Sequence, residues 1–381
     1  MKKILLLSPF FYPEPISTGK YNTIIAKELS KVVESIDVLC AHPIYPKWKV
    51  DPTDKQLDGI TAIRGGKWLK FPGNMLLRRA VLEIWFCLFV FFRIISTGKK
   101  YTHIVSIFPP SLFMLCVPFL SKKAKLIGIV HDLQGIYAIQ NAGFLKKTIY
   151  GAIRWVEKKA FNSCDKLIFL SEDMKKNSEK LYSLEHNKNI VRYPFVTINK
   201  FINNQKLIHI IPDGQQAIVY SGALGEKQAP NKLATFMSAF VGKNPDFKAF
   251  IFSQGHEFET LKGEFNDIEF FSLVDECDLP ELLLRSTIQV LPQESGTSDG
   301  SLPSKLPNLL ASQCRILCVT DPDSELVRIL DSYSLSAVSH TWDIDTLIIK
   351  TERLLESKKV DNDATLLTKF TKESLTKSII N

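Results

Sequence analysis

The stretch QAIVYSGALGEKQAPNKLATF, Gln216 to Phe236, has the form of a strand, a glycine turn and a helix. Its first part is a continuous apolar run, and such runs, where helices separate them, are typical of parallel strands covered on both faces. The form recurs through the second half in FKAFIFS, DIEFFS, IQVLPQ and RILCVT. The first half carries KILLLS, SIDVLCA, HIVSIF, KLIGIV and KLIFLS. This repetition predicts an α/β protein with two doubly wound, Rossmann-like domains facing across a cleft.

The chain length agrees with two domains. A chain of 381 residues with 45% hydrophobic content exceeds one comfortable core. A polar stretch from Thr197 to Gln215 interrupts the alternation of strands and helices and is the predicted linker. We therefore expect an N-terminal domain over residues 1–200 and a C-terminal domain over 201–365. Residues 366–381 are expected to form a helix that packs back on the first domain.

The cysteines and the first residues indicate further which kind of protein this is. None of the seven cysteines forms a CxxC pair, so most are interpreted as reduced, buried thiols. The opening MKKILLLSPFFYPEP reaches prolines after only five apolar positions. We interpret it as a first strand and not as a signal peptide.

Charge divides the chain more clearly than composition does. Residues 1–200 hold 31 Lys and Arg against 15 Asp and Glu, a balance of +16. Residues 201–381 hold 17 against 25, a balance of −8. A basic half indicates nucleic acid, an anionic membrane surface, or a solvated lysine-rich face. Nucleic acid is disfavoured, because the positive half is interleaved with apolar sequence and lacks a recognisable reading module.

The most apolar segment, RRAVLEIWFCLFVFFRII from Arg78 to Ile95, lies in this basic half. Thirteen residues, Glu83 among them, separate Arg79 from Arg93. A spanning helix needs about 20 apolar residues, so we expect no bilayer crossing. Two interpretations stay open: a core helix under the first sheet, or an interfacial helix on anionic lipid. In the second interpretation, the residues that contact the membrane, or a substrate held in it, are Arg78, Arg79, Trp85, Phe86, Phe89, Phe92 and Arg93.

Ligands of open α/β sheets bind beyond the carboxyl ends of the strands, so the loops there are the candidate sites. After the first strand, Gly19 opens an amphipathic helix whose N–H groups could face an anion, although such a glycine also serves turns. His131 and Asp132 follow KLIGIV, as a functional pair or as a buried hydrogen bond. Gly222 and Lys227 follow QAIVYSG, and the lysine could neutralise phosphate or simply be solvated.

The fourth loop, LPQESGTSDGSLPSKLPNLLAS, joins a strand to a helix at Leu291–Ser312. Its Gly296–Gly300 turn would let backbone approach a ligand. Proline is favoured in a first helical turn, so Pro303 predicts that the helix begins at Ser304 and presents N–H groups to phosphate. Asn308 would share the face of Ser304 by its four-residue spacing and point toward the same ligand, unless it is an ordinary helix residue.

The loops together resemble the retaining glycosyltransferases of family 4, which have the GT-B fold. The resemblance is greatest to the bacterial enzymes of colanic-acid and O-antigen assembly, including the WbuB-type L-fucosamine transferases. Its order and spacing cover nearly the whole chain. It is carried by PFFYPEPISTGKY, HPIYPKW, HDLQ, YSGALGEK and LPSKLPNLLAS.

The resemblance implies a partner for each domain. The second domain would bind a nucleotide-sugar donor, usually UDP-linked, and the first a polyprenyl-diphosphate-linked glycan acceptor. The enzyme would retain anomeric configuration, use no metal or other cofactor, and work peripherally on the cytoplasmic face of the membrane in surface polysaccharide synthesis. The basic, apolar first half is what such an acceptor requires.

Residue roles carry over by position. Lys227 matches the family lysine that contacts the donor diphosphate, and Gly222 lies in the turn before it. Gly19 matches the first-loop glycine near the same phosphates. His131, which Asp132 follows, matches the histidine near the donor sugar. Ser304, Lys305 and Leu306 fall beside the donor. The chain departs from the family at three places. Asn308 stands where the family has a glutamate that holds the donor ribose, and its amide could still hydrogen-bond that ribose. Gly300 replaces a second glutamate, and Ala223 stands for an arginine. Glu294 or Asp299 could approach the sugar instead.

These departures keep two other functions open: a catalytically silent partner subunit, and an epimerase-type enzyme of the same fold with a soluble substrate. An Asp-x-Asp motif, Asp321–Asp323, follows a strand as a metal site does in the other large glycosyltransferase fold. That fold would not supply two complete strand–helix series, so no metal site is predicted. A departing nucleoside diphosphate would instead be stabilised by N–H dipoles and Lys227.

Overall fold

The computed structural model describes residues 2–97, 101–135, 144–198, 205–298, 302–358, 360 and 363–381. The chain divides into a first unit, Met1–Tyr193 with Lys372–Asn381, and a second unit, Pro194–Thr371. The boundary therefore precedes the predicted one. The stretch predicted as a linker also belongs to the second unit, because Leu207 and Ile211 are buried in its core.

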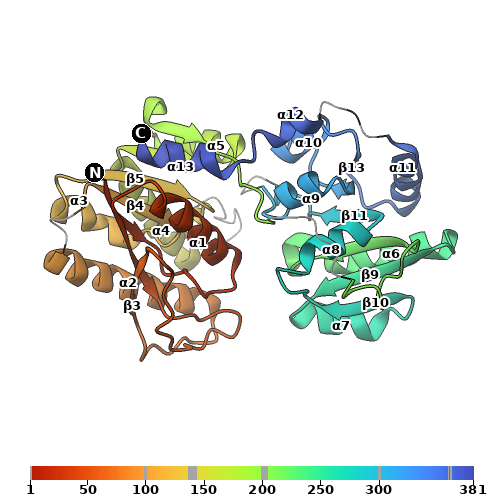
Figure 1. Cartoon of the computed structure of the whole chain (residues 1–381), viewed down its shortest axis with the longest axis horizontal. Helices are drawn as coiled ribbons and strands as arrows, with labels where there is room; N and C mark the ends of the chain where they lie inside the picture. The colour runs from red at the N-terminus through yellow and green to blue at the C-terminus, as the bar shows by residue number, and fades with distance from the viewer. Residues whose placement is uncertain are drawn as a thin grey trace. The chain divides into compact units, whose positions relative to one another are not determined.

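The first unit contains a parallel sheet of seven strands in the order β3-β2-β1-β4-β5-β6-β7 (Figure 1). The order reverses between β1 and β4, which makes this pair the switch point of the sheet. The strands are β1 Lys3–Leu7, β2 Ser35–Ala41, β3 Thr61–Gly65, β4 His103–Phe108, β5 Lys125–Val130, β6 Lys166–Phe169 and β7 Asn189–Val191. The edge strands β3 and β7 were not predicted, since they are short and only partly buried.

Helices cover the first sheet. They are α1 Ser17–Ser30, α2 Met75–Thr97, η2 Leu112–Leu115, α3 Val117–Leu120, α4 Phe144–Asn162, α5 Glu172–Tyr182, η4 His186–Lys188 and α13 Lys372–Ile380. Side chains from α2, α4 and α5 share one core cluster with the strands. The last helix, α13, lies beside α1, and Lys372 pairs with Glu28 of α1 at 2.9 Å (Figure 1). The end of the chain is thus part of the first unit, but only from Lys372 on, whereas residues 366–371 of the predicted terminal helix belong to the second unit.

Helix α2 has one buried face. By length and composition its 23 residues are enough to cross a membrane. However, a stripe at helical spacing packs into the core of the first unit, and it consists of Leu82, Trp85, Phe86, Val90 and Ile94. The core-helix interpretation is therefore right for this face. The expectation that Trp85 and Phe86 enter headgroups is wrong, because they are 9% and 0% exposed.

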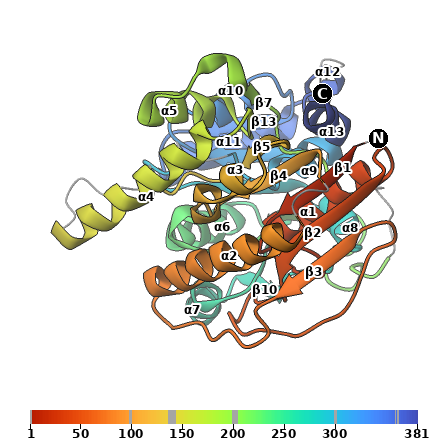
Figure 2. The ribbon, with the colours of Figure 1, turned by 90° about the vertical axis from the view of Figure 1, so that its left-hand side faces the viewer.

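The opposite face of α2 is apolar and uncovered within its unit. Phe89 is partly buried and stacks on Trp85, with ring centroids 5.4 Å apart. Farther out, five apolar side chains are each more than half exposed: Leu77, Ile84, Leu88, Phe92 and Ile95. We call these five the outer face of α2. Figure 2 shows the helix running along the outside of its unit.

The second unit contains six parallel strands in the order β10-β9-β8-β11-β12-β13. They are β8 Gln216–Ser221, β9 Phe247–Ser253, β10 Ile268–Ser272, β11 Ile288–Pro292, β12 Arg315–Val319 and β13 Ser336–Ser339. The helices are η5 Glu226–Gln228, α6 Pro230–Lys243, α7 His256–Glu264, α8 Leu279–Arg285, α9 Leu306–Ser312, α10 Glu325–Leu330, α11 Ile344–Glu356 and α12 Asp363–Leu367. The prediction of two doubly wound parallel α/β units is confirmed. The second switch point lies between β8 and β11.

Candidate functional site

A lysine lies at the switch point of the second sheet. Lys305 follows β11, yet its Nζ lies 3.9 Å from the ring centroid of Tyr220 and donates to the Ser221 carbonyl at 3.2 Å. Both contacts are at the carboxyl end of β8. The next residue, Gly222, has φ +145°, and a Cβ there would lie 3.6 Å from the lysine Nζ. The two loops at the switch point therefore converge on one ammonium group.

The Lys305 ammonium is poorly compensated. No carboxylate in the described part of the chain forms an ion pair with it. Burial lowers the pKa of Lys305 to about 7, against a smaller opposing effect of the Cys318 thiol. The aromatic face of Tyr220 and a carbonyl oxygen supply only partial negative charge. A desolvated cation at a switch point is suited to an anionic ligand such as phosphate.

The loop with Lys227 lies at the same edge of the sheet. The Lys227 carbonyl accepts from the Glu294 backbone N–H at 2.8 Å, which ties the loops after β8 and β11 together. The Glu294 carboxylate pairs with Lys232 at 2.7 Å. Glu294 is thus engaged by a lysine at this edge, and its predicted contact with a sugar would compete with that pair.

The turn after β11 is held by Asp321. Its carboxylate accepts from the Gly296 N–H at 3.0 Å and from the Ser298 hydroxyl at 2.6 Å. Burial alone would raise the pKa of Asp321, but these hydrogen bonds lower it. The first aspartate of the Asp-x-Asp motif therefore orders a loop. The predicted residues Asp299 and Gly300 lie outside the described residues.

Helix α9 begins two residues later than predicted. It starts at Leu306, and Ser304 and Lys305 belong to the preceding turn, in which the Leu306 N–H donates to the Pro303 carbonyl at 3.0 Å. Pro307, not Pro303, occupies the first helical turn. Ser304 is exposed, whereas the Leu306 side chain is fully buried. Among the three residues predicted here, Lys305 therefore presents the group best suited to a phosphate.

The Asn308 side chain is buried and forms hydrogen bonds with Thr197 of the same unit. The side chain is 7% exposed, and its Oδ1 accepts from the Thr197 N–H at 2.9 Å. Its Nδ2 donates to the Thr197 hydroxyl at 2.9 Å. The amide thus anchors the segment that enters the second unit. A hydrogen bond to a ribose, as predicted for Asn308, would have to replace these contacts.

His131 lies at the carboxyl end of β5 in the first unit. Its backbone N–H donates to the Phe108 carbonyl at 2.9 Å, and its ring meets Tyr21 edge-on with centroids 6.1 Å apart. Burial lowers the pKa of His131 to about 4, so the imidazole is neutral at pH 7. Within the described ranges its Nε2 has no hydrogen-bond partner. The carboxylate of Asp132 accepts from the Leu133 N–H at 3.0 Å.

The loop after His131 is fixed by Glu157 of α4, a residue that the sequence did not single out. Its buried carboxylate accepts from the N–H groups of Gln134 and Gly135 at 3.0 and 2.9 Å and from the Tyr182 hydroxyl. The sequence signal that could have identified Glu157 is a glutamate within an otherwise apolar stripe of a predicted helix.

Gly19 has a packing role. Helix α1 begins at Ser17, so Gly19 is inside its first turn and does not open it. A Cβ on Gly19 would lie 2.9 Å from the Glu14 carbonyl oxygen. Glu14 is buried and accepts from the N–H groups of Ile44 and Tyr45 at 2.8 and 3.0 Å. Close packing of the first loop accounts for the glycine, and its proximity to phosphate stays a prediction.

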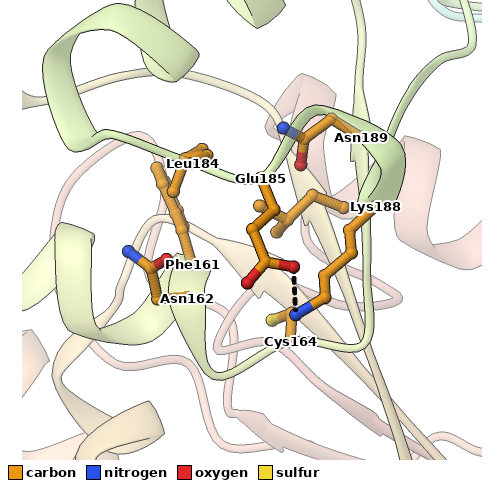
Figure 3. Close-up of a pocket in the computed structure, with 8 residues that line it drawn as sticks. Phe161, Asn162, Cys164, Leu184, Glu185, Lys188 and Asn189 are labelled. Carbon is orange, nitrogen blue, oxygen red and sulfur yellow. Dashed lines mark ion pairs between the residues drawn. The ribbon is translucent and has the colours of Figure 1, made fainter.

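A shallow hollow in the first unit lies at the opposite edge of the sheet. Cys164 and Asn189, at the amino ends of β6 and β7, help to line it, and Glu185 pairs with Lys188 across it at 3.0 Å (Figure 3). Ligands of parallel sheets bind at the carboxyl ends, so this hollow is not a candidate site. Across the described ranges no group of three or more His, Cys, Asp or Glu could hold a metal ion. Metal independence stays a prediction.

Comparison with known proteins agrees with the resemblance seen in the loops. No protein-family model matches the chain. It is 24% identical over 371 residues, 88% of each chain, to the "Putative colanic acid biosynthesis glycosyl transferase WcaI" of Escherichia coli (strain K12).

Solved structures show the same fold. WaaG, a glycosyltransferase involved in lipopolysaccharide biosynthesis, aligns with a TM-score of 0.70 at 12% identity, over 99% of both chains. Sucrose-phosphate synthase from Thermosynechococcus elongatus aligns with a TM-score of 0.73 at 13% identity, over 100% of this chain and 97% of its own. HepE from Anabaena, in complex with UDP and glucose, aligns with a TM-score of 0.64 at 10% identity, over 100% and 98%. The GT-B fold is thereby confirmed.

Proposed function

We propose that this chain is a retaining glycosyltransferase that moves a sugar from a nucleotide donor, UDP-linked, to a lipid-linked glycan in bacterial surface polysaccharide synthesis. The observation that carries the proposal is the Lys305 ammonium at the switch point of the second sheet, beside Gly222 and over Tyr220. The sequence similarity to WcaI along most of the chain supports the same class of reaction.

The chemistry requires charge stabilisation at the departing phosphate. When the sugar leaves, negative charge develops on the diphosphate oxygen that bonded it. Lys305 and Lys227 would stabilise that charge, and fixed cations lower the barrier when they interact more strongly with the transition state than with the ground state. Two lysines would offset the diphosphate charge, so the proposed reaction uses no metal.

In the first unit, His131 and Asp132 would contact the transferred sugar. The neutral His131 imidazole offers one donor and one acceptor, which suits hydroxyl groups of a sugar. Its low pKa makes it a poor general acid at pH 7. His131 would therefore bind and orient the sugar.

The outer face of α2 would place the enzyme on the cytoplasmic surface of an anionic membrane. Phe119 of α3, which packs beside α2, is 75% exposed and extends the apolar surface. Exposed cations of α2 and of the turn after α3 would reach lipid phosphate with their long side chains: Arg79, Arg93, Lys122 and Lys123. Helix α2 would thus contact lipid through residues other than the buried Trp85 and Phe86.

A second candidate function is that of a catalytically silent subunit. The observation that favours it is the Asn308 amide, which Thr197 engages and which is therefore not free for a ribose. Such a subunit would bind membrane and glycan without releasing nucleotide.

The test is nucleotide release by the purified protein from a panel of nucleotide-sugars, with and without membrane lipid extract. We expect release of UDP that depends on the extract and that Lys305→Met reduces. Lys262→Met, on the exposed surface of α7, is the matched control and should behave as the parent. Absence of release from every donor, with the protein folded, would favour the silent subunit.

A further inference from the structure

Arg64 is a charged residue that the proposed reaction does not yet use. It lies near the carboxyl end of β3, in register with Cys40 of β2. Its Nη2 donates to the Tyr12 carbonyl at 2.7 Å. Its Nε and Nη1 are buried and have no hydrogen-bond partner in the described chain. No carboxylate among the described residues pairs with it. A guanidinium in this state is costly unless an anion completes it.

His42 lies beside Arg64 and is influenced by one further cation, Lys67, and by one carboxylate, Asp54. His42 follows β2, and its Nδ1 accepts from the Thr53 N–H at 3.1 Å. Burial, and then the charge of Arg64, lowers the pKa of His42, with a further contribution from Lys67. The hydrogen bond from Thr53 and the Asp54 carboxylate act in the opposite direction, each less strongly than Arg64 and more strongly than Lys67. The other carboxylate nearby, Glu14, is occupied by the N–H groups of Ile44 and Tyr45.

The position of Arg64 connects it with α2. The two residues that follow it are glycines that pack closely against this helix. A Cβ on Gly65 would lie 2.6 Å from the Phe89 ring, and one on Gly66 would lie 2.7 Å from the Trp85 ring. Arg64 is therefore next to backbone fitted against the helix whose outer face we assign to the membrane. Trp85 belongs to the core-facing side of α2, so these contacts place Arg64 within the unit to which we assign the lipid-linked acceptor.

We propose that Arg64, with His42 beside it, binds the diphosphate of the lipid-linked acceptor. This inference rests on the proposed function for the nature of the acceptor. The planar guanidinium matches two phosphate oxygens at once through an edge that pairs Nη2 with Nε or with Nη1, the two groups that now lack partners. The side chain as a whole is half-buried, so a rotation away from the Tyr12 carbonyl presents this fork to the ligand.

The test is binding to vesicles without any donor. Phosphatidylcholine vesicles carry polyprenyl diphosphate, polyprenol, or phosphatidylglycerol at equal density. The full-length protein should bind the diphosphate vesicles more tightly than the polyprenol vesicles. Arg64→Gln should reduce that preference about tenfold or more and leave polyprenol binding unchanged, because it removes a charge-assisted fork. Arg64→Lys should give an intermediate preference, since it keeps the charge and loses the fork.

Arg353→Gln is the matched control, because Arg353 is exposed on α11 of the second unit; it should keep the parent preference. Thermal unfolding checks that each variant is folded, and if Arg64→Gln is not, Arg64→Lys decides. A parent-like preference in the folded Arg64 variant overturns the inference. So does an equal loss on phosphatidylglycerol vesicles, which would make Arg64 a headgroup contact. The assay uses no nucleotide-sugar, so failure of glycosyl transfer would not affect it.

Discussion

Replacing Lys305 with methionine removes the cation at the second switch point and little else. The methionine side chain retains an unbranched apolar stem that can pack on Tyr220. The hydrogen bond from the ammonium to the Ser221 carbonyl is lost, which costs about 1.5–3 kcal/mol. Removal of a desolvated charge without a carboxylate partner acts in the opposite direction. We therefore expect the unfolding temperature of Lys305→Met to equal or exceed that of the parent.

The effect on the donor should be large. A hydrogen bond between an ammonium and a phosphate contributes about 1.5–3 kcal/mol, which corresponds to roughly a 10- to 150-fold change in dissociation constant. Titration calorimetry should show that weakening for UDP. Uridine, which has no phosphate, should bind parent and variant alike. Lys305→Arg should keep most of the UDP affinity.

The pH dependence follows from the lowered pKa. Burial places the Lys305 pKa near 7 in the free protein, so above about pH 7 the ammonium must regain a proton to bind phosphate. Affinity for UDP should fall by up to about tenfold per pH unit from pH 7 to 9. Lys305→Arg stays charged and should show no such fall. In the absence of UDP, the unfolded chain binds more protons than the folded one between about pH 7 and 10.5, so Lys305 should make stability rise across that window.

Two results would refute this reasoning. One is equal UDP affinity in the parent and Lys305→Met at pH 6.5, which would mean that the cation does not meet the diphosphate. The other is a parent pH profile parallel to that of Lys305→Arg from pH 7 to 9. The comparison of these two proteins cancels the titration of the nucleotide's own phosphate, which occurs near pH 6.

Other perturbations separate the remaining roles. Lys227→Ala should lower turnover by about 10²–10³-fold with unchanged unfolding temperature, and near-parental turnover would remove Lys227 from the mechanism. Asn308→Ala should lower the free energy of unfolding by about 1–3 kcal/mol in urea titration, because Thr197 loses its partner. Asn308→Asp keeps the oxygen that accepts from the Thr197 N–H and is the control. A loss of UDP affinity in Asn308→Ala without a loss of stability would instead make Asn308 a ribose ligand. Phe92→Glu should weaken binding to anionic vesicles about tenfold or more, whereas Ile349→Glu, an exposed apolar residue of α11, should not; equal binding by both would remove the outer face of α2 from the membrane contact.

The fold was predictable because strands buried on both faces are continuous apolar runs. SIDVLCA and KLIGIV coincide with β2 and β5, and both stay buried over most of their length. The edge strand β3, TAIRG, has one buried residue and carries an arginine, so its sequence lacks that signal. The unit boundary was misplaced because nothing in the sequence around Thr197 indicates the second domain, and only the folded chain shows that Asn308 of the second unit holds Thr197.

The loops that form the candidate site were predictable from the sequence, whereas the contacts of their individual side chains were less so. Resemblance indicated the loops after β8 and β11, and both lie at the second switch point. The contact of Lys305 with Tyr220 joins those two loops, and no local pattern encodes it. The Asn308 amide was expected to point toward a ribose from the face of Ser304, but α9 starts at Leu306 and the amide contacts Thr197. For α2, periodicity located an apolar helix without indicating which face enters the core.

Transfer of radiolabelled sugar from a UDP-sugar to an organic-soluble, lipid-linked acceptor tests the central claim most directly. The protein is incubated with each labelled donor and the lipid-linked glycan, and the label is counted in the organic phase. We predict label in the lipid phase with one UDP-sugar, loss of that transfer in Lys305→Met, and no loss in Lys262→Met. A folded protein that binds UDP but moves no label from any donor, or a Lys305→Met variant that transfers as fast as the parent, would contradict the account.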